Sequence, residues 1–301
     1  MSWAGRVVGR SDPQKLGAVE VAGPPRQPDG CLVEAEGLSF AYAEGDRRVV
    51  AAAGISLRLE RASCTALLGP TGSGKSTLLF LLRGLLEPDS GAVRIDGLAP
   101  GDAAFTAAQR SVGVVFQQAE RQLFAVSARE DVAFGPRQLG WGADAVSAAV
   151  TEALEVVGLP EDRFGDRHPY SLSGGEQRRL ALAGVLAMRP RALLLDEPFV
   201  GLDPGARRDL AATVGRLRGG GRTILLATHD VDYAWALCDE RIVLAEGRVM
   251  AAGPWSFDAE GVSVLTANRL RVPSLVELWQ RLGRPAGEAP RTAAAAAEAL
   301  L

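Results

Sequence analysis

The chain has 301 residues and a net charge of −3, with 47% hydrophobic and 23% charged residues. This composition fits a globular protein with a sizeable core, and an acidic excess argues against a general nucleic-acid-binding surface. No apolar run approaches the roughly 20 residues that span a bilayer, and the N-terminus lacks the basic-then-apolar pattern of a secretory signal. We therefore expect no nucleic-acid partner and no membrane span in this chain.

The two ends of the chain differ in composition from its middle. Residues 1–30 contain four prolines among glycine and polar residues, which predicts a flexible extension. Near the other end, residues 283–290 have the composition of a linker. The alanine-rich tail over 286–301 predicts a helix that frays.

Between these ends, short apolar strands alternate with amphipathic helices. This alternation predicts an α/β fold with a largely parallel sheet, and the mostly helical stretch 118–188 predicts an inserted helical subdomain. The expected strands are 32–36, 54–59, 65–68, 92–95, 112–116, 192–195, 223–227, 241–244 and 248–251. The expected helices begin at Lys75, Ala128, Ala143, Gly174, Pro204 and Val231.

Cysteine and lysine are both rare. Cys31, Cys64 and Cys238 are far apart in the sequence and have no metal-ligand spacing, so we interpret them as thiols in a reducing cytosol. Lys15 and Lys75 are the only lysines among 33 basic residues. A lysine in so arginine-rich a chain indicates a position where a broad guanidinium would not serve.

A glycine-rich loop, GPTGSGKST, follows the third expected strand and opens a helix. Its glycines let backbone N–H groups surround phosphate oxygens, and the helix N-terminus adds positive potential. Lys75 would reach the β- and γ-phosphates of ATP, and the Ser76 hydroxyl would bind Mg²⁺. The expected nucleotide-binding residues of this loop are Gly69, Pro70, Thr71, Gly72, Ser73, Gly74, Lys75, Ser76 and Thr77.

Two adjacent carboxylates end the apolar strand in ALLLDEP. Asp196 would hold the Mg²⁺, and Glu197 would polarise a water molecule for attack on the γ-phosphate. Adjacent acids at a strand end can also be a solvated turn, but the phosphate loop earlier in the chain favours the catalytic interpretation.

A second pair of glycines occurs in SLSGGEQRR. Ser173, Gly174 and Gly175 predict another phosphate-binding helix N-terminus, although a plain helix start is the alternative and one ATP does not need two such loops.

The sequence contains two histidines. His229 follows a strand, where ligand sites collect in open α/β sheets. His168 has no such placement, and we interpret it as structural.

Together these motifs resemble the ATP-binding cassette (ABC) ATPase family, in the family's order and at about its spacing over residues 32–253. The resemblance implies a P-loop NTPase with a RecA-like core, an antiparallel β subdomain and an inserted helical subdomain, forming an ATPase domain over 31–262. The matching motifs are the Walker A loop 69–77, the signature 172–177, the Walker B strand 192–196 with Glu197, the D-loop 201–203 and the switch histidine His229.

The resemblance also implies roles for single residues. Tyr42 would stack on adenine, and Gln117 would sense both Mg²⁺ and the attacking water. In this family two cassettes dimerise head to tail, so the signature of one chain closes over the ATP of the other. A second ABC ATPase chain is therefore implied, and the residues expected to contact nucleotide across the pair are Ser173, Gly174, Gly175, Gln177 and Asp203.

The stretch FQQAERQLFAVSAREDVAFGP is similar to the ATPases of energy-coupling-factor (ECF) importers, which move vitamins or transition-metal ions such as cobalt and nickel. Gln118 and Ala119 replace the usual Asn and Pro, and Ala128 replaces a common Val. The similarity implies an integral membrane coupling subunit, a solute-binding membrane subunit and a position at the cytoplasmic face of the cell membrane. It also implies a C-terminal helical segment over 263–285.

Leu123 and Phe124 lie in this stretch, and we expect them to form an apolar spot that docks the membrane subunit. The alternative is that both pack into the helical subdomain. Rival functions are an ATPase of another ABC importer or exporter, a non-transport ABC ATPase, and a nucleotide-binding module without turnover.

Overall fold

The structure is a computed structural model that describes residues 30–45 and 47–300. The flexible extension expected for 1–30 lies outside the described residues except for Gly30. Within the described residues, no helix combines the length and apolar character needed to cross a membrane.

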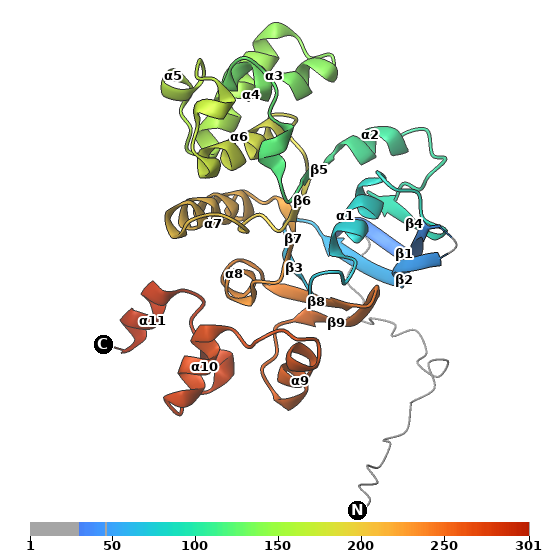
Figure 1. Ribbon diagram of the computed structural model, residues 1–301, viewed down its shortest axis with the longest axis vertical. Helices are drawn as coiled ribbons and strands as arrows, with labels where there is room; N and C mark the ends of the chain where they lie inside the picture. The colour runs from blue at the N-terminus through green and yellow to red at the C-terminus, as the bar shows by residue number, and fades with distance from the viewer. Residues whose placement is uncertain (1–29, 46, 301) are drawn as a thin grey trace, which may run out of the picture.

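A six-stranded sheet forms the centre of the molecule, in the order β5-β6-β7-β3-β8-β9 (Figure 1). The first five strands are parallel and β9 runs antiparallel to β8. Every residue of β3, β5, β6 and β7 is buried, as is usual for parallel strands covered on both faces. The strands are β3 (Cys64–Leu68), β5 (Val112–Val115), β6 (Ala192–Asp196), β7 (Thr223–Thr228), β8 (Glu240–Ala245) and β9 (Arg248–Pro254).

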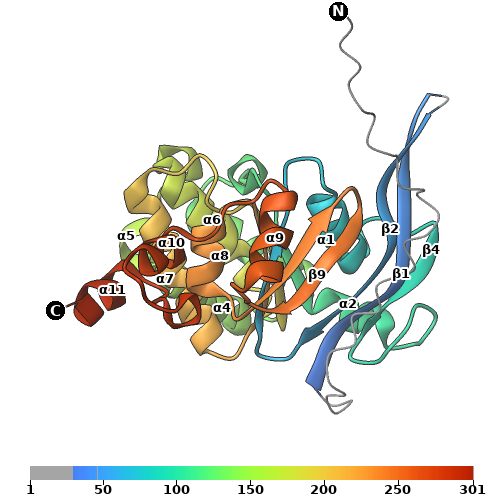
Figure 2. The same ribbon diagram turned by 90° about the horizontal axis from the view of Figure 1, so that it is seen from below.

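A three-stranded antiparallel sheet, β2-β1-β4, lies at one side of the molecule (Figure 2). Its strands are β1 (Cys31–Glu44), β2 (Arg47–Glu60) and β4 (Ser90–Ile95). The expected α/β fold with an antiparallel subdomain is confirmed. The strands expected at 32–36 and 54–59 are longer than predicted, because their hairpin ends are exposed and carry no buried alternation.

The helices cover both faces of the central sheet and build a separate lobe. Helices α3 to α6 form the helical subdomain at the top of Figure 1, within the expected range 118–188. The helices are α1 (Lys75–Arg83), α2 (Phe105–Arg110), α3 (Ala128–Gln138), α4 (Ala143–Val156), α5 (Glu161–Phe164), α6 (Gly174–Leu186), α7 (Pro204–Gly219), α8 (Val231–Leu237), α9 (Ala259–Ala267), α10 (Ser274–Arg281) and α11 (Ala293–Leu300). Short 3₁₀ turns are η2 (Ala119–Gln122), η3 (Pro169–Ser171) and η4 (Ala286–Glu288).

Alternate residues of the central strands pack into two different hydrophobic clusters, one on each face of the sheet. Leu193 and Leu195 of β6 pack into the cluster shared with the helical subdomain, α7 and α8. Leu194, between them, packs with α1 and the small sheet. Because successive side chains of a strand point to opposite faces, each strand joins both layers and fixes their relative position.

The C-terminal segment packs against α8. Trp235 of α8 contacts Trp255 and Phe257 edge-on, and the same cluster includes Trp279 of α10. The boundary expected at 262 falls inside α9.

The stretch expected to be a linker differs from that expectation, because it contains η4 and buries Ala289. The Arg291 guanidinium that follows lies 4.4 Å from the centre of the Trp235 ring. It also donates to the Cys238 carbonyl at 2.7 Å. These contacts join residues far apart in the sequence, so a local pattern did not reveal them.

Two further hydrogen bonds tie α10 to the start of α8. The Asp232 carboxylate accepts from the Ser274 backbone N–H at 2.6 Å and from the Ser274 hydroxyl at 3.0 Å. The Arg271 guanidinium pairs with the same carboxylate at 2.6 Å. The C-terminal segment is thus attached to α8 three residues after His229.

Candidate nucleotide-binding site

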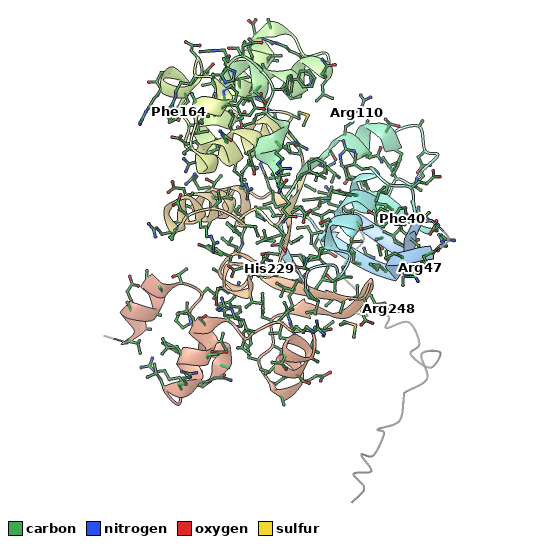
Figure 3. All side chains as sticks on the ribbon, in the orientation of Figure 1. Phe40, Arg47, Arg110, Phe164, His229 and Arg248 are labelled. Carbon is green, nitrogen blue, oxygen red and sulfur yellow. The ribbon has the colours of Figure 1, made fainter. Side chains whose placement is uncertain are left out.

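Four neighbouring parallel strands bring the expected site residues to one edge of the central sheet. Gln117 follows β5, Asp196 ends β6, His229 follows β7 and Gly69 follows β3. The carboxyl ends of parallel strands meet at a common edge, where ligands bind in open α/β sheets. Figure 3 shows His229 between the central strands and α8.

The glycine-rich loop between β3 and α1 allows close approach of backbone atoms. A Cβ atom on Gly69 would lie 2.2 Å from the Leu244 carbonyl oxygen, and one on Gly74 would lie 2.2 Å from that of Ala51. Gly74 also has φ +100°, a conformation that L side chains rarely adopt. The loop therefore requires glycine at both positions.

Helix α1 begins without a side-chain cap, so its first N–H groups remain available to an anion. Lys75 is buried beside them. Its ammonium donates to the carbonyl oxygens of Gly69 at 2.8 Å and Pro70 at 3.2 Å, and it lies 3.5 Å from the Glu197 carboxylate. A compact cation with three donors suits this site better than a planar guanidinium.

Glu197 is buried immediately after β6 with φ +45°, which is unusual for a residue that is not glycine. Its carboxylate accepts from the Thr228 hydroxyl at 3.2 Å and contacts His229 Nδ1 at 3.0 Å. The His229 side chain is 54% exposed. Glu197 is thus oriented from one side by β7, and the histidine that contacts it can reach solvent.

Asp196 and Ser76 have the chemistry of a magnesium site. Burial raises the pKa of Asp196, and Glu197 adds to the rise, while the hydrogen bond from Ser76 and the charge of Lys75 act against it. Asp196 Oδ1 is buried and has no hydrogen-bond partner among the described residues. A buried carboxylate oxygen without a partner beside a hydroxyl fits a hard, oxygen-preferring cation.

Two expected nucleotide contacts lie at the borders of this edge. The Tyr42 hydroxyl lies 3.2 Å from the Thr77 hydroxyl, and its ring packs edge-on against Phe40. The aromatic ring is therefore next to the first turn of α1, and its role in stacking on adenine stays a prediction. Gln117 is exposed in the turn after β5.

The signature residues are on α6, in the helical subdomain (Figure 1). The Ser173 hydroxyl accepts from the Glu176 N–H at 3.3 Å, and the Glu176 carboxylate accepts from the Ser173 N–H at 2.8 Å, which forms a capping box. A Cβ atom on Gly175 would lie 2.6 Å from Ala206 of α7, so this glycine permits close helix packing. Gln177 donates to the Leu172 carbonyl at 3.0 Å.

Asp203 caps α7. It accepts from the N–H groups of Gly205 at 2.8 Å and Ala206 at 3.0 Å. His168 has a similar structural position, because its Nδ1 accepts from the Tyr170 N–H at 3.3 Å at the start of η3.

The expectation that Leu123 and Phe124 share one apolar spot is wrong for Leu123. Leu123 is 2% exposed and packs in the main core, whereas Phe124 is 62% exposed. Asp131 causes the separation, since its carboxylate accepts from the Phe124 and Ala125 N–H groups at 2.9 Å and directs the chain outward.

Phe124 packs edge-on against Phe134, with ring centres 4.9 Å apart. The Tyr170 hydroxyl donates to the Leu123 carbonyl at 2.6 Å, which brings its ring to the same segment. We call these exposed side chains the apolar patch; its members are Phe124, Val126, Phe134 and Tyr170.

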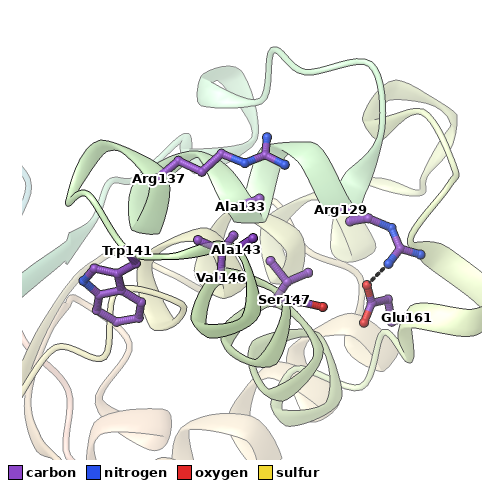
Figure 4. A pocket seen from close by; sticks show the side chains of 9 residues that line it. Arg129, Ala133, Arg137, Trp141, Ala143, Val146, Ser147 and Glu161 are labelled. Atoms are coloured by element: carbon purple, nitrogen blue, oxygen red, sulfur yellow. Dashed lines mark hydrogen bonds and ion pairs between the residues drawn. The ribbon is translucent and has the colours of Figure 1, made fainter.

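A cavity of about 420 Å³ lies away from these loops, within the helical subdomain (Figure 4). The Arg129–Glu161 ion pair is at one end of it. None of the residues expected to bind nucleotide lines it. Its lining residues are Arg129, Ala133, Arg137, Trp141, Ala143, Val146, Ser147, Val150 and Glu161.

Several contacts could not be identified from the sequence. Thr228, which donates to Glu197, was missed, although a polar residue just before His229 was an available signal. Cys64 and Cys238 are buried with their sulfur atoms 3.2 Å apart, and 174 residues of separation hid that pairing. Arg178 and Glu120 form a partly buried ion pair that no motif indicated.

Comparison with known proteins agrees with the site. Residues 52–200 match the ABC transporter family. The ATP-binding protein EcfA2 of an energy-coupling factor transporter of Symbiobacterium thermophilum is 45% identical over 231 residues, which cover 76% of this chain and 80% of the relative. This chain belongs to the ABC transporter ATPase family. It is an ATP-binding, ATP-hydrolysing protein of the P-loop fold.

Other members extend the comparison. The cobalt import ATP-binding protein CbiO of Rhodobacter capsulatus is 40% identical over 264 residues, which cover 87% of this chain and 92% of the relative. The solved structure of CbiO1 from Clostridium perfringens, part of the ABC transporter complex CbiONQ, has a TM-score of 0.69 and 32% identity, and covers 86% of this chain and 98% of that one. A dimeric ATP-binding cassette bound to ADP and phosphate has a TM-score of 0.66 and 28% identity, and covers 75% of this chain and all of that one.

Proposed function

We propose that this ATPase drives an ECF-type importer of a vitamin or a transition-metal ion of the cobalt and nickel class. It would act at the cytoplasmic face of the cell membrane, together with an integral coupling subunit and a solute-binding membrane subunit. The relatives named above as EcfA2 and CbiO support this subgroup. The observation that carries the proposal is the apolar patch, of which Phe124, Val126 and Phe134 occur in the segment similar to ECF ATPases.

The patch has the character of a small protein interface. Three of its four exposed side chains are aromatic. Its segment is anchored by the Phe124 N–H, which donates to Asp131, and by the Leu123 carbonyl, which accepts from the Tyr170 hydroxyl. Aromatic anchors with a polar rim are typical of such interfaces. An ATPase that works on a membrane subunit needs a surface of this kind.

The active form is proposed to be a pair of ATPase chains. Ser173 and Gly175 of one chain would contact the γ-phosphate of ATP held by the Walker A loop of the other. The dimeric cassette with ADP and phosphate supports this arrangement. Closure would be driven by ATP, because ATP would contact both chains only in the closed state.

The chain's own residues would divide the chemistry of hydrolysis. The α1 N–H groups and Lys75 would bind phosphate oxygens, and Ser76 and Asp196 would hold Mg²⁺, with Gln117 reaching it on closure. The cation neutralises charge on the phosphates when bound. Glu197 would accept the proton of the attacking water, and His229 would hold the Glu197 carboxylate in place.

The proposed chemistry is tested by Glu197→Gln, which keeps the shape of the side chain and removes the base. We expect ATP binding to persist, the hydrolysis rate to fall by roughly 10²–10⁴-fold, and a stable ATP-dependent dimer to accumulate. Turnover is measured by phosphate release, and the dimer by light scattering with and without ATP. Unchanged turnover would remove Glu197 from the role of base.

The proposed partners are tested by purifying the chain from its native membranes in mild detergent and identifying co-purified proteins by mass spectrometry. An integral coupling subunit with a small, very hydrophobic solute-binding protein is expected, and Phe124→Ser should lose both. Met250→Ser, which alters an exposed apolar side chain of β9, should keep them. A pair of ordinary permeases would overturn the ECF assignment and leave the ATPase chemistry intact.

A further inference from the structure

One arginine connects three parts of the molecule that the proposed mechanism uses. Arg178 lies on α6, directly after the signature, and its side chain is only 7% exposed. A guanidinium removed from water is costly unless each of its N–H groups finds a partner. The partners of Arg178 therefore indicate what this residue does.

All three nitrogens of the Arg178 guanidinium donate hydrogen bonds. Nε donates to Glu120 Oε2 at 3.2 Å, and one terminal nitrogen donates to both oxygens of the same carboxylate at 3.1 and 2.9 Å. The other terminal nitrogen donates to the carbonyl oxygens of Pro198 at 3.1 Å and Val200 at 2.6 Å. A guanidinium holds its donors in a fixed planar arrangement, so one side chain contacts a carboxylate along one edge and two backbone carbonyls from another nitrogen.

The two carbonyl groups belong to the turn that follows Glu197. The Val200 N–H closes this turn by donating to the Glu197 carbonyl at 3.2 Å. Glu197 itself has φ +45°, a backbone conformation that persists only where surrounding contacts impose it. By holding Pro198 and Val200, Arg178 fixes the backbone on which the Glu197 carboxylate depends.

The carboxylate partner belongs to the segment that leads to the apolar patch. Glu120 is in η2, three residues after Gln117 and four before Phe124. Any displacement of this segment acts on the Glu120–Arg178 pair, and the rigid guanidinium passes it to the turn after Glu197. The path needs no intermediate residue, because one side chain contacts both ends.

We infer that Arg178 is a positioning residue that couples the segment after Gln117 to the placement of Glu197. Its partners are Glu120 and the carbonyl groups of Pro198 and Val200, so it would act on the reaction through Glu197. The inference rests on the proposed role of Glu197 as the base, and it is independent of the solute and of the membrane partners.

The test compares Arg178→Lys and Glu120→Gln with Glu152→Gln. Lysine has three donors at one point and cannot serve a carboxylate and two carbonyls together. Glu152 is the matched control, because it also pairs with an arginine, Arg189, at 2.9 Å in the helical subdomain, but that pair is exposed.

We expect Arg178→Lys to lower kcat by roughly 10- to 100-fold and Glu120→Gln by roughly 3- to 10-fold, with KM for ATP changed by less than about twofold. Glu152→Gln should leave both constants within about twofold of the wild type. Each Arg178 and Glu120 variant, combined with Glu197→Gln, should still form the ATP-dependent dimer, which shows that α6 and its signature are folded.

Several outcomes would overturn the inference. One is a kcat for folded Arg178→Lys within about threefold of the wild-type value. A second is a loss of kcat in the control Glu152→Gln as large as that in Arg178→Lys. A third is loss of the ATP-dependent dimer together with a lower melting temperature in Glu120→Gln. This variant keeps the size and shape of the side chain and removes only the charge that pairs with Arg178, so it carries the test if Arg178→Lys fails to fold. Full turnover in Glu197→Gln alone would instead remove the proposed base, whatever the Arg178 variants do.

Discussion

Two helices of this chain begin at glycine-rich turns, and they differ in whether a side chain caps the N-terminus. Helix α1 follows Gly74 and has no side-chain cap. Helix α6 follows Ser173 and is closed by a capping box with Glu176. Both sequences were predicted to be phosphate-binding helix starts, but only α1 leaves its first N–H groups without a partner from its own side chains.

The difference indicates how the two helices can take part in binding. The α1 terminus depends on a ligand to complete its hydrogen bonds, and the ammonium of Lys75 is next to it. The α6 terminus already has a side-chain cap in the isolated chain, so it can fold and remain exposed until the nucleotide of another chain arrives. In a site shared between two chains, the uncapped α1 terminus of one chain would bind the phosphates and the capped α6 terminus of the other would close over them.

The largest expected effect is at α1. Lys75→Ala should lower kcat/KM for ATP by roughly 10³-fold, because it removes the ammonium that contacts this loop's carbonyls and Glu197. Lys75→Arg should lose nearly as much, since a guanidinium does not fit between Gly69 and Glu197. Steady-state phosphate release measures both, and substantial activity in Lys75→Arg would mean that charge alone suffices.

An intermediate effect is expected at the α6 cap. Ser173→Ala should cost about 1 kcal/mol of folding free energy and lower kcat by about tenfold, because the hydroxyl both caps the helix and would contact the γ-phosphate. Ser127→Ala is the matched control: Ser127 caps α3 with the same 3.3 Å bond to the N–H three residues later. Urea unfolding should give similar losses for both, and kcat should fall only in Ser173→Ala. Equal kcat values in the two variants would make Ser173 a cap and nothing more.

The smallest effect concerns the charge at the same terminus. Glu176→Gln keeps a capping side chain and removes a negative charge near the incoming phosphates, so the ATP concentration for half-maximal activity should fall by roughly two- to fivefold. If the ATP concentration for half-maximal activity is unchanged or higher, the Glu176 carboxylate does not repel the bound nucleotide.

The same variant has a defined pH dependence. Burial raises the pKa of Glu176, but hydrogen bonds from the Ser173 N–H and hydroxyl outweigh it and leave the pKa below its ordinary value. A lowered folded pKa means that the ionised carboxylate adds stability above the ordinary carboxylate range, and that this contribution disappears as the pH falls through the folded pKa. The difference in melting temperature between wild type and Glu176→Gln should therefore shrink on acidification.

The sequence was sufficient for features that depend on neighbouring residues. The loop from Gly69 to Thr77 joins a strand to a helix with the chemistry of a phosphate site in nine consecutive residues, so its position and form were predictable. The strand that ends in Asp196 was predictable for the same reason. The roles assigned to these residues stay predictions until the variants are measured.

Features that depend on contacts between residues distant in the chain could not be predicted from the sequence. Leu123 and Phe124 are adjacent and both apolar, and the hydrogen bonds that the Phe124 and Ala125 N–H groups donate to the distant Asp131 carboxylate separate a buried side chain from an exposed one. The Arg178–Glu120 pair spans 58 residues, and the turn carbonyls that complete its contacts carry no side-chain signal. The packing of α10 and η4 on α8 likewise depends on Trp235 and Arg291, which no local pattern links.

The attachment of the C-terminal segment to Asp232 affects how short a working version of this protein can be. The family match ends at residue 200, and a boundary drawn from the motifs alone would stop soon after β9. A chain cut there would leave the Asp232 carboxylate without Ser274 and Arg271, and would expose the indole of Trp235 to water. Since α8 begins two residues after His229, we expect a working version of the chain to extend at least through α10.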